Sequence, residues 1–231
     1  MLDYFNDLMR TFTQEEYLGY ICGDDPDFTP GEGIEYSNTN TVLLALIMDN
    51  IDGNHADIIT NEIINKLNLK STFYKNEPNY PAPIGAVNTY LDQKGDGNFM
   101  NSTRIERNFA NMTIGHDAML ASANDYFTFI QALMKGNLVS ESSLEEMLSV
   151  AHYSDNGGYG LGLEIIKSKT KDITMIGHNG GSLGAANNVF YYPERDITIV
   201  ICSNFGDFLD SEAGVNFQLL FKDVIDLLMP N

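Results

Sequence analysis

The chain has 231 residues, 43% of them hydrophobic, which is typical of a folded globular protein of one domain rather than of a disordered or fibrous one. Lys and Arg number 13 against 32 Asp and Glu, and the resulting net charge of -19 disfavours binding to nucleic acid or to anionic lipid. Two cysteines are too few for a disulfide scaffold, and no apolar run reaches the roughly 18 residues of a membrane span.

The first predicted helix follows the triplet Tyr36-Ser37-Asn38. The side chain of Ser37 or Asn38 can accept bonds from the first free amides, and Gly53 is a plausible end. Residues 41–48 are apolar on nearly every side, so we expect this helix to be buried.

Three further segments complete a first half that is predicted to be mostly helical. Isoleucines at helical spacing predict a helix over 56–67, whereas residues 76–111 are rich in Asn, Pro, Gly and Asp and predict a long connection. Ser122 and Asp125 form a capping-box-like pair that predicts a helix ending at Gly136. A short helix is predicted over 140–150.

The second half has a different pattern. Strands are predicted over 159–166, 173–176, 188–192 and 197–202, with a tight turn at 193–196. Closely spaced strands with short turns favour an antiparallel sheet, and the amphipathic tail 211–229 should pack on one face of it. The apolar residues that we expect to form the buried side of this tail are Val215, Leu219, Leu220, Val224, Leu227 and Leu228.

This order of elements predicts an α+β fold. We expect a single domain over 1–231, with a mostly helical lobe over 1–150. Antiparallel strands and a C-terminal helix packed on them should follow over 151–231.

Two segments are candidates for chemistry. In the first, a strand is predicted to end at His178 and to be followed by Asn179, Gly180 and Gly181. Glycines allow a ligand to approach the main chain, so that an amide can point at a developing negative charge. Taken alone, this segment is better explained as a glycine-rich hairpin with a solvated histidine.

The second segment is the triplet at 36–38. A phenol such as Tyr36 can act as a general base if cationic neighbours lower its pKa from about 10, and Asn38 can bind a substrate amide. The simpler alternative is a helix cap with Tyr36 packed beside it. Both readings are compatible, because a helix N-terminus holds its capping residues rigidly.

Metal binding has little support in the sequence. Residues 92–97 resemble a calcium loop, but Lys94 and Thr103 occupy positions where oxygen ligands of the loop are needed, so we interpret them as a turn. His55, His116 and His152 are scattered without zinc-site spacing, and we expect surface or packing roles. We expect no metal and no cofactor.

In combination, these motifs resemble the serine β-lactamase and penicillin-binding-protein family, in the branch of class C β-lactamases, D-alanyl-D-alanine carboxypeptidases and related esterases. In that branch a Tyr-x-Asn triplet follows a Phe-x-Pro-Gly stretch, as 36–38 follow 28–31 here. A His-x-Gly element often replaces Lys-Thr-Gly, and here it is 178–180. The helix start at 120–133 and the segments 159–162 and 192–204 also match in order.

The nucleophile of that family is missing. Its Ser-x-x-Lys pair precedes the Tyr-x-Asn triplet, but none occurs before Tyr36. The one such pattern, 168–171, lies between two predicted strands, where no helical turn can place Lys171 beside Ser168. We therefore expect a truncated β-lactamase-like fold that lacks the nucleophile helix and the first strands.

The resemblance implies a role for each site residue. Tyr36 would be the base or proton shuttle, and Asn38 would orient the substrate amide. His178 would hold a substrate carboxylate or tune Tyr36, while Asn179 and Gly180 would border the substrate. The amide of Gly181 would supply one oxyanion donor. Because a neutral histidine replaces a fixed charge, a peptidase or esterase is favoured over a dedicated β-lactamase.

Two functions stay open. The chain is expected to be the C-terminal portion of a serine hydrolase that is inactive without its nucleophile, and the sequence leaves open whether the chain alone is an enzyme. The alternative is a non-catalytic binding or scaffolding protein with a degenerate fold of this type.

Expected partners are a small-molecule or peptide-like acyl substrate and, through the apolar groove left by the missing part, a second copy of the chain. The resemblance implies a periplasmic or secreted location, although the N-terminal residues do not read as a signal peptide.

Overall fold

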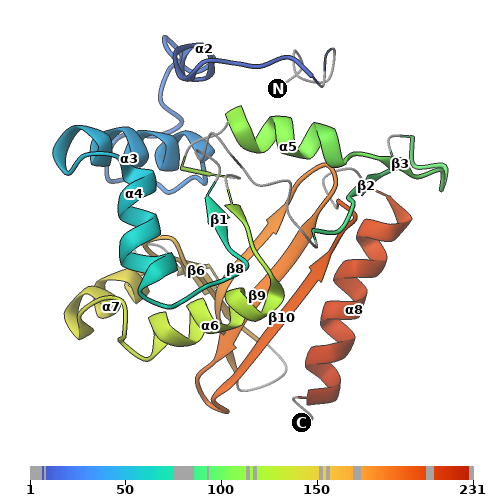
Figure 1. Cartoon of the computed structure of the whole chain (residues 1–231). Helices are drawn as coiled ribbons and strands as arrows, with labels where there is room; N and C mark the ends of the chain where they lie inside the picture. The colour runs from blue at the N-terminus through green and yellow to red at the C-terminus, as the bar shows by residue number, and fades with distance from the viewer. Residues whose placement is uncertain are drawn as a thin grey trace.

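A six-stranded antiparallel sheet is the centre of the molecule (Figure 1). The structure is a computed structural model that describes residues 7, 9–74, 86–92, 94–112, 115–116, 119–150, 153–154, 157–168, 173–206 and 211–228. The strand order is β10-β9-β8-β7-β6-β5. The strands are β5 (Tyr153–Ser154), β6 (Gly157–Tyr159), β7 (Glu164–Lys167), β8 (Thr174–Gly181), β9 (Ala186–Tyr192) and β10 (Ile197–Ser203).

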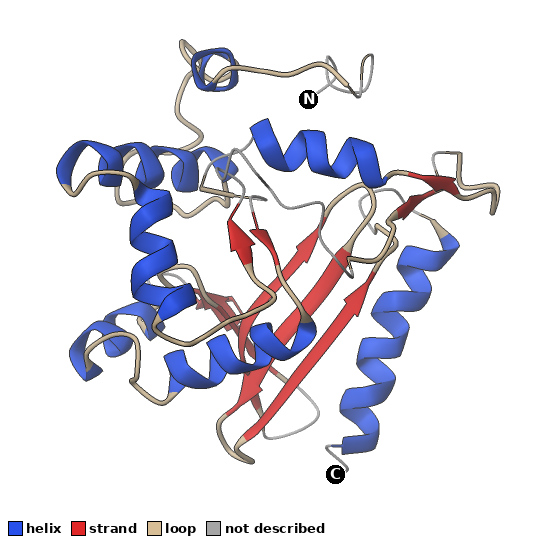
Figure 2. Cartoon of the chain, in the orientation of Figure 1, coloured by secondary structure: helices blue, strands red, loops and turns tan. Residues whose placement is uncertain are grey.

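Helices cover both faces of this sheet (Figure 2). On one face, α6 (Ala123–Met134) buries Ile130 and Leu133 against Leu163 and Val189. On the other, α8 (Glu212–Leu228) packs Phe221 against a cluster that includes Phe190, the aromatic rings lying 5.6 Å apart. The sheet is therefore apolar on both sides, and the α+β fold class predicted from the sequence is confirmed.

The other helices lie on the α6 side of the sheet or across its end. They are α2 (Gln14–Gly19), α3 (Asn38–Ile51), α4 (His55–Ile59) with its π-helical continuation η1 (Thr60–Asn65), α5 (Thr103–Met112) and α7 (Glu141–Leu148). Two small sheets pair β1 (Phe73–Tyr74) with β4 (Met119–Leu120) and β2 (Tyr90–Leu91) with β3 (Met100–Asn101). Helices α2 and α5 lie across one end of the main sheet (Figure 1).

Several helix predictions agree with the structure. Ser122 and Ser140 cap α6 and α7 by accepting bonds from Asp125 and Ser143 main-chain amides. The Asp125 carboxylate does not complete a capping box, because it instead accepts bonds from the amide of Ser71 and the hydroxyl of Thr72. This aspartate therefore joins α6 to the segment before β1.

Helix α3 is less buried than its sequence predicted. Val42 and Ala45 are buried, but Leu43, Leu44, Ile47 and Ile51 are exposed. Ser37 is the N-cap residue, yet its side chain makes no capping bond. The prediction of a buried helix was wrong, because among the described residues only one side of α3 has a neighbour to pack on, and of the two predicted capping residues, Ser37 and Asn38, Ser37 holds the cap position without a capping bond.

The C-terminal helix has the predicted position but a different packed face. Phe217 and Phe221 are buried, with Val224 and Ile225 against the same core. Val224 was the one predicted contact that lies there; the exposed apolar residues of α8 are Val215, Leu219, Leu220, Leu227 and Leu228. The phenylalanines are larger, and the helix turns them toward Phe190 and Tyr192 of the sheet.

Two segments were read wrongly. Residues 159–166 were predicted as one strand, but a turn at Gly162, with φ of 77°, separates β6 from β7. Residues 76–111 were predicted as an irregular connection, but they contain α5, which buries Ile105 beside Leu91 and Leu183. Residues 75–85 of that connection lie outside the described part of the chain.

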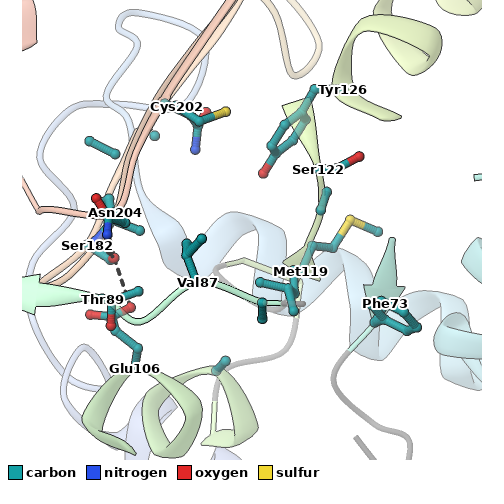
Figure 3. Close-up of a pocket in the computed structure, with 18 of the residues that line it drawn as sticks. Phe73, Val87, Thr89, Glu106, Met119, Ser122, Tyr126, Ser182, Cys202 and Asn204 are labelled. Atoms are coloured by element: carbon teal, nitrogen blue, oxygen red, sulfur yellow. Dashed lines mark hydrogen bonds between the residues drawn. The ribbon is translucent and has the colours of Figure 1, made fainter. Parts of the chain in front are cut away.

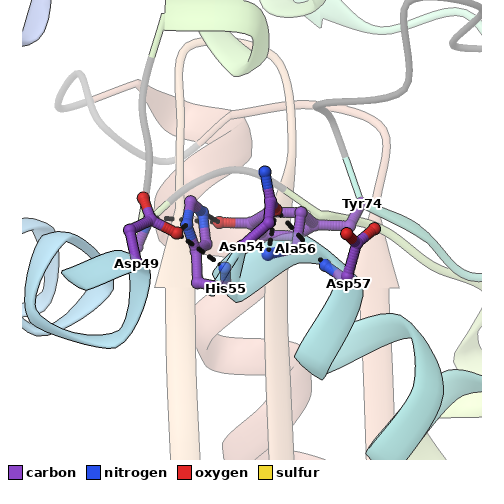
Figure 4. Close-up of polar contacts among 7 residues, drawn as sticks. Asp49, Asn54, His55, Ala56, Asp57 and Tyr74 are labelled. Atoms are coloured by element: carbon purple, nitrogen blue, oxygen red, sulfur yellow. Dashed lines mark hydrogen bonds and ion pairs between the residues drawn. The ribbon is translucent and has the colours of Figure 1, made fainter. Parts of the chain in front are cut away.

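A buried histidine ties the helical lobe together (Figure 4). His55 is 2% exposed, and its Nδ1 lies 2.6 Å from Oδ1 of Asp49 at the end of α3. Its Nε2 lies 2.9 Å from the hydroxyl of Tyr74 in β1, which also accepts a bond from the amide of Gly115. These bonds join α3, α4 and β1. His55 therefore packs inside the lobe, and it does so through hydrogen bonds rather than apolar contacts.

Candidate active site

His178 projects from β8, which lies between β7 and β9 in the sheet. The strand does not end at His178, as the sequence suggested, but continues through Asn179 and Gly180 to Gly181. A Cβ at Gly177 would overlap the carbonyl of Val189 on the neighbouring strand, so the residue before His178 has to be a glycine. The sheet therefore holds the main chain of this segment rigidly.

Three aromatic rings from distant parts of the sequence meet at this point. The centroid of the Tyr36 ring lies 6.1 Å from that of His178 and 5.8 Å from that of Tyr159. The Tyr159 and His178 centroids are 5.6 Å apart, with the rings nearly perpendicular at 89°. Tyr36 comes from the segment before α3 and is 59% exposed, so the cluster opens to solvent on the Tyr36 side.

Tyr159 makes the closest contact with His178. Its hydroxyl lies 2.7 Å from Nε2 of the imidazole, while Nδ1 is bonded to the main-chain carbonyl of Asn179. Burial, with smaller contributions from Tyr36 and Glu164, raises the pKa of Tyr159 to about 12. The hydroxyl therefore keeps its proton at neutral pH.

The other predicted residues of the strand have different surroundings. The side-chain amide of Asn179 donates to both oxygens of Glu164 on β7, at 3.2 and 3.3 Å. Burial raises the pKa of Glu164, and the neighbouring imidazole of His178 acts in the opposite direction.

Asn38 is the first residue of α3, two positions after Tyr36. Its carbonyl accepts a bond of 2.8 Å from the hydroxyl of Thr41, which fixes the first turn of the helix. The structure thus places Tyr36 against His178 and Asn38 on the adjoining helix start. The roles of these residues stay predictions.

A cavity of about 1040 Å³ lies at the end of β8 (Figure 3). It reaches the candidate site through Gly180, Gly181 and Ser182, but Tyr36 and His178 do not line it. Its wall is mixed, since it combines apolar side chains such as Phe73 and Met119 with the ionisable groups Lys70, Glu106, Arg107 and His116.

Glu106 was not singled out from the sequence, but it fixes the turn that follows β8. The hydroxyl of Ser182 donates to Glu106 at 2.9 Å (Figure 3). The amide of Gly184 donates to the other carboxylate oxygen at 2.7 Å. A Cβ at Gly184 would overlap the Ser102 hydroxyl, so this close approach needs a glycine. The spacing of Ile105 and Phe109 was the available signal for the helix that carries Glu106.

The serine of the one Ser-x-x-Lys pattern directly follows a strand. Ser168 comes after β7, and its amide donates to the carbonyl of Ile173, which precedes β8. Residues 169–172 lie outside the described part, as does His152. Within the described ranges, no three His, Cys, Asp or Glu side chains gather as metal ligands would.

Comparison with known proteins identifies the family. A family model described as Beta-lactamase matches residues 2–220, and the chain therefore belongs to that family. It is 27% identical over 217 residues to penicillin-binding protein 4* of Bacillus subtilis (strain 168), covering 90% of this chain and 46% of the relative. The chain thus spans about half the length of that curated relative.

Solved structures show the same fold. A D-stereospecific amidohydrolase from Streptomyces sp. has a TM-score of 0.72 at 24% identity, covering 88% of this chain and 60% of that one. A penicillin binding protein from Bacillus halodurans has a TM-score of 0.76 at 20% identity, covering 96% and 67%. The resemblance read from the motifs is confirmed at the level of family and fold.

None of the helices in the described ranges combines the length and the apolar character that crossing a membrane requires.

Proposed function

We propose that this chain provides one half of a serine acyl-transfer site, namely the proton-shuttle and oxyanion half. The observation that carries the proposal is the convergence of Tyr36 and His178, 142 positions apart in the sequence, with ring centroids at 6.1 Å, in a chain of the Beta-lactamase family. The similarity to a penicillin-binding protein and to an amidohydrolase supports an acyl substrate, either an amide or an ester.

The proposed reaction begins when a serine hydroxyl attacks the substrate carbonyl. Tyr36 relays the serine proton toward the leaving group, while Asn38 orients the substrate amide. The amide of Gly181 donates to the oxyanion, and the bond to the leaving amine or alcohol then breaks. Water cleaves the acyl-enzyme and regenerates the serine.

The serine has to come from outside the 231 residues. Such a nucleophile needs a helical turn that places a lysine beside it, and the one Ser-x-x-Lys pattern starts at the end of β7. We therefore propose that the 231-residue chain is inactive by itself and acts as part of a longer domain. A single domain with a helical lobe over 1–150 and a sheet over 151–231 is part of this proposal.

A fluorophosphonate probe tests the proposal. The 231-residue chain should not be labelled, and the chain extended by the in-frame sequence upstream of Met1 should be labelled at the serine of a Ser-x-x-Lys pair. Labelling of the shorter chain would contradict the missing nucleophile. An extended chain that stays unlabelled but binds acyl ligands would instead support the non-catalytic binding protein.

Self-association is a further part of the proposal. The cavity wall contains Phe73, Val87 and Met119, and the last two are also exposed. Exposed apolar surface of this kind promotes association, although a net charge of -19 on each copy opposes it. Sedimentation at low and high salt should show more dimer as salt screens the charge, and a monomer under both conditions would contradict this part.

A further inference from the structure

The contacts of His178 restrict what this residue can do in the proposed site. We propose that Tyr159 is a positioning residue, whose hydroxyl holds neutral His178 as the Nδ1–H tautomer and fixes the ring against Tyr36. The functional consequence of this inference rests on the proposed function, whereas the contacts from which it is argued lie within this chain. Tyr159 belongs to the segment 159–162, which resembles the family, but the resemblance implied no role for this residue.

The tautomer follows from the two partners of the imidazole. The carbonyl of Asn179 can only accept a hydrogen bond, so Nδ1 has to carry a proton. In a neutral ring Nε2 then has a lone pair, and the hydroxyl of Tyr159 at 2.7 Å donates to it. Each ring nitrogen thus has one partner, and the two partners select the same tautomer.

Tyr159 is suited to act as this donor. Its burial favours the protonated phenol, and the ring stands at 89° to the imidazole, so the hydroxyl meets the ring edge where the lone pair lies. Tyr159 is the last residue of β6, and β6 is joined to β8 through β7, so the sheet fixes the distance between the two side chains.

One consequence concerns proton transfer. Because the lone pair of Nε2 already accepts the proton of Tyr159, it is not free to take a proton from Tyr36. His178 is therefore a fixed polar neighbour of Tyr36, and it does not act as the base that deprotonates Tyr36. The proton of the nucleophile has to leave through Tyr36 and groups of the completed site.

A second consequence concerns the substrate. With Nδ1–H bonded to the Asn179 carbonyl and Nε2 occupied by Tyr159, neutral His178 has no N–H left to donate to a substrate carboxylate. The nearby Glu164 would repel such a group when ionised. The structure therefore assigns to this position an uncharged part of an amide or ester substrate, not a carboxylate.

Nitrogen-15 NMR of histidine-labelled protein measures the tautomer directly and needs no acyl transfer. The chain has four histidines, and the loss of one signal in His178→Gln assigns the residue. In the native chain, at a pH about two units above the ordinary imidazole value of about 6.5, His178 should be mainly Nδ1–H. A ring that is mainly Nε2–H would overturn the proposal without any variant.

The variant Tyr159→Phe removes the donor and keeps the ring. The ratio of Nδ1–H to Nε2–H at His178 should fall about tenfold, the effect of losing one hydrogen bond. Tyr36→Phe is the matched control and should leave the ratio within about twofold, since the partners of the two ring nitrogens, Tyr159 and the Asn179 carbonyl, are unchanged in it. An unchanged ratio in Tyr159→Phe would overturn the proposal.

His55 provides an internal reference in the same spectra. It has an oxygen acceptor at Nδ1 and the Tyr74 hydroxyl at Nε2, so its signals should be those of an Nδ1–H ring in every variant at position 159. If the His55 signals also change in Tyr159→Phe, the fold has been disturbed, and the native spectrum alone then decides the proposal.

Acetate serves as the probe for the second consequence. Adding it to the native chain should leave the His178 ring signals unchanged, and a saturable shift confined to His178 would contradict the assignment of an uncharged group. These results are independent of labelling by a fluorophosphonate. The Tyr159 contact can therefore hold even if the acyl-transfer proposal fails, and the reverse is also true.

Discussion

His55 and His178 have the same pattern of contacts in two different surroundings. Each lies between a tyrosine hydroxyl at Nε2 and an oxygen acceptor at Nδ1. The acceptor of His55 is the Asp49 carboxylate, and the ring is 2% exposed (Figure 4). The acceptor of His178 is a main-chain carbonyl, and the ring lies against Tyr36, which is 59% exposed.

The comparison teaches that a Tyr–His pair does not by itself identify an active site. Around His55 every polar atom of the ring is satisfied inside the fold, and the bonds join three elements of one lobe. Around His178 the bonds fix the ring, but the neighbouring phenol of Tyr36 stays accessible to a ligand. The contacts of His55 stabilise the fold, whereas those of His178 hold its ring beside the exposed side chain of Tyr36.

The largest difference between the two regions is expected in stability. Replacing His55 by Ala should lower the free energy of unfolding by about 2–4 kcal/mol, because a cavity opens and Asp49 and Tyr74 lose a partner. His178→Ala should cost no more than about 1 kcal/mol, because its surroundings reach solvent. Urea denaturation of both variants measures this, and equal losses would contradict the distinction.

A smaller loss is expected at the turn that supports the candidate site. Glu106→Gln leaves one acceptor oxygen where Ser182 and Gly184 need two, so we expect a loss of about 1–2 kcal/mol. Glu145→Gln in α7 removes the same charge and is the control. Hydrogen exchange at the Gly184 amide should accelerate in Glu106→Gln only, and an unchanged exchange rate would show that the carboxylate does not hold the turn.

The His55 region should also respond to acid. Burial raises the pKa of Asp49, but bonds from the main chain and ring of His55 outweigh it, so the folded-state pKa is lowered. The associated stability is present above the unfolded-state value of about 3.9 and is lost as the pH falls through the folded value.

The variant Asp49→Asn tests this response. It should be less stable than the native chain at pH 7, and the difference should shrink as the pH approaches about 3. Asp223→Asn in α8 makes the same change in net charge and is the control. If the difference in stability between the native chain and Asp49→Asn is the same at every pH, the charge of the Asp49 carboxylate does not contribute to stability.

The smallest effect is expected beside His178 and has the opposite sign. Burial raises the pKa of Glu164, so the stability linked to its protonated form is lost as the pH rises through the folded-state value. Glu164→Gln keeps an acceptor for Asn179 and should stabilise the fold at pH 7 by a few tenths of a kcal/mol, reduced by solvent screening. Thermal unfolding at pH 7 and at about pH 4 should show this gain only at the higher value.

Strong local patterns made parts of the fold predictable. The alternating apolar runs of β9 and β10 and the Ser122 cap of α6 agree with the structure. Helix α5 was missed because Ile105 and Phe109 are isolated among polar residues, and its position depends on packing against Leu91 and Leu183.

The candidate site was predictable only in part. Tyr36 belongs to the triplet before α3 and His178 to a glycine-rich segment, two patterns that suggested chemistry, and the fold brings their rings together. Tyr159 and Glu106 could not be assigned contacts from the sequence, because their partners lie 19 and 76 residues away along the chain. Such pairs depend on strand register and on the docking of α5, which no local pattern specifies.

The most direct test of the central claim is the rate of fluorophosphonate labelling in the N-terminally extended chain with and without Tyr36→Phe. If Tyr36 is the proton shuttle, the variant should fold normally and label at least about 100-fold more slowly. A labelling rate that is the same in both proteins would show that the phenol next to His178 has no part in acyl transfer.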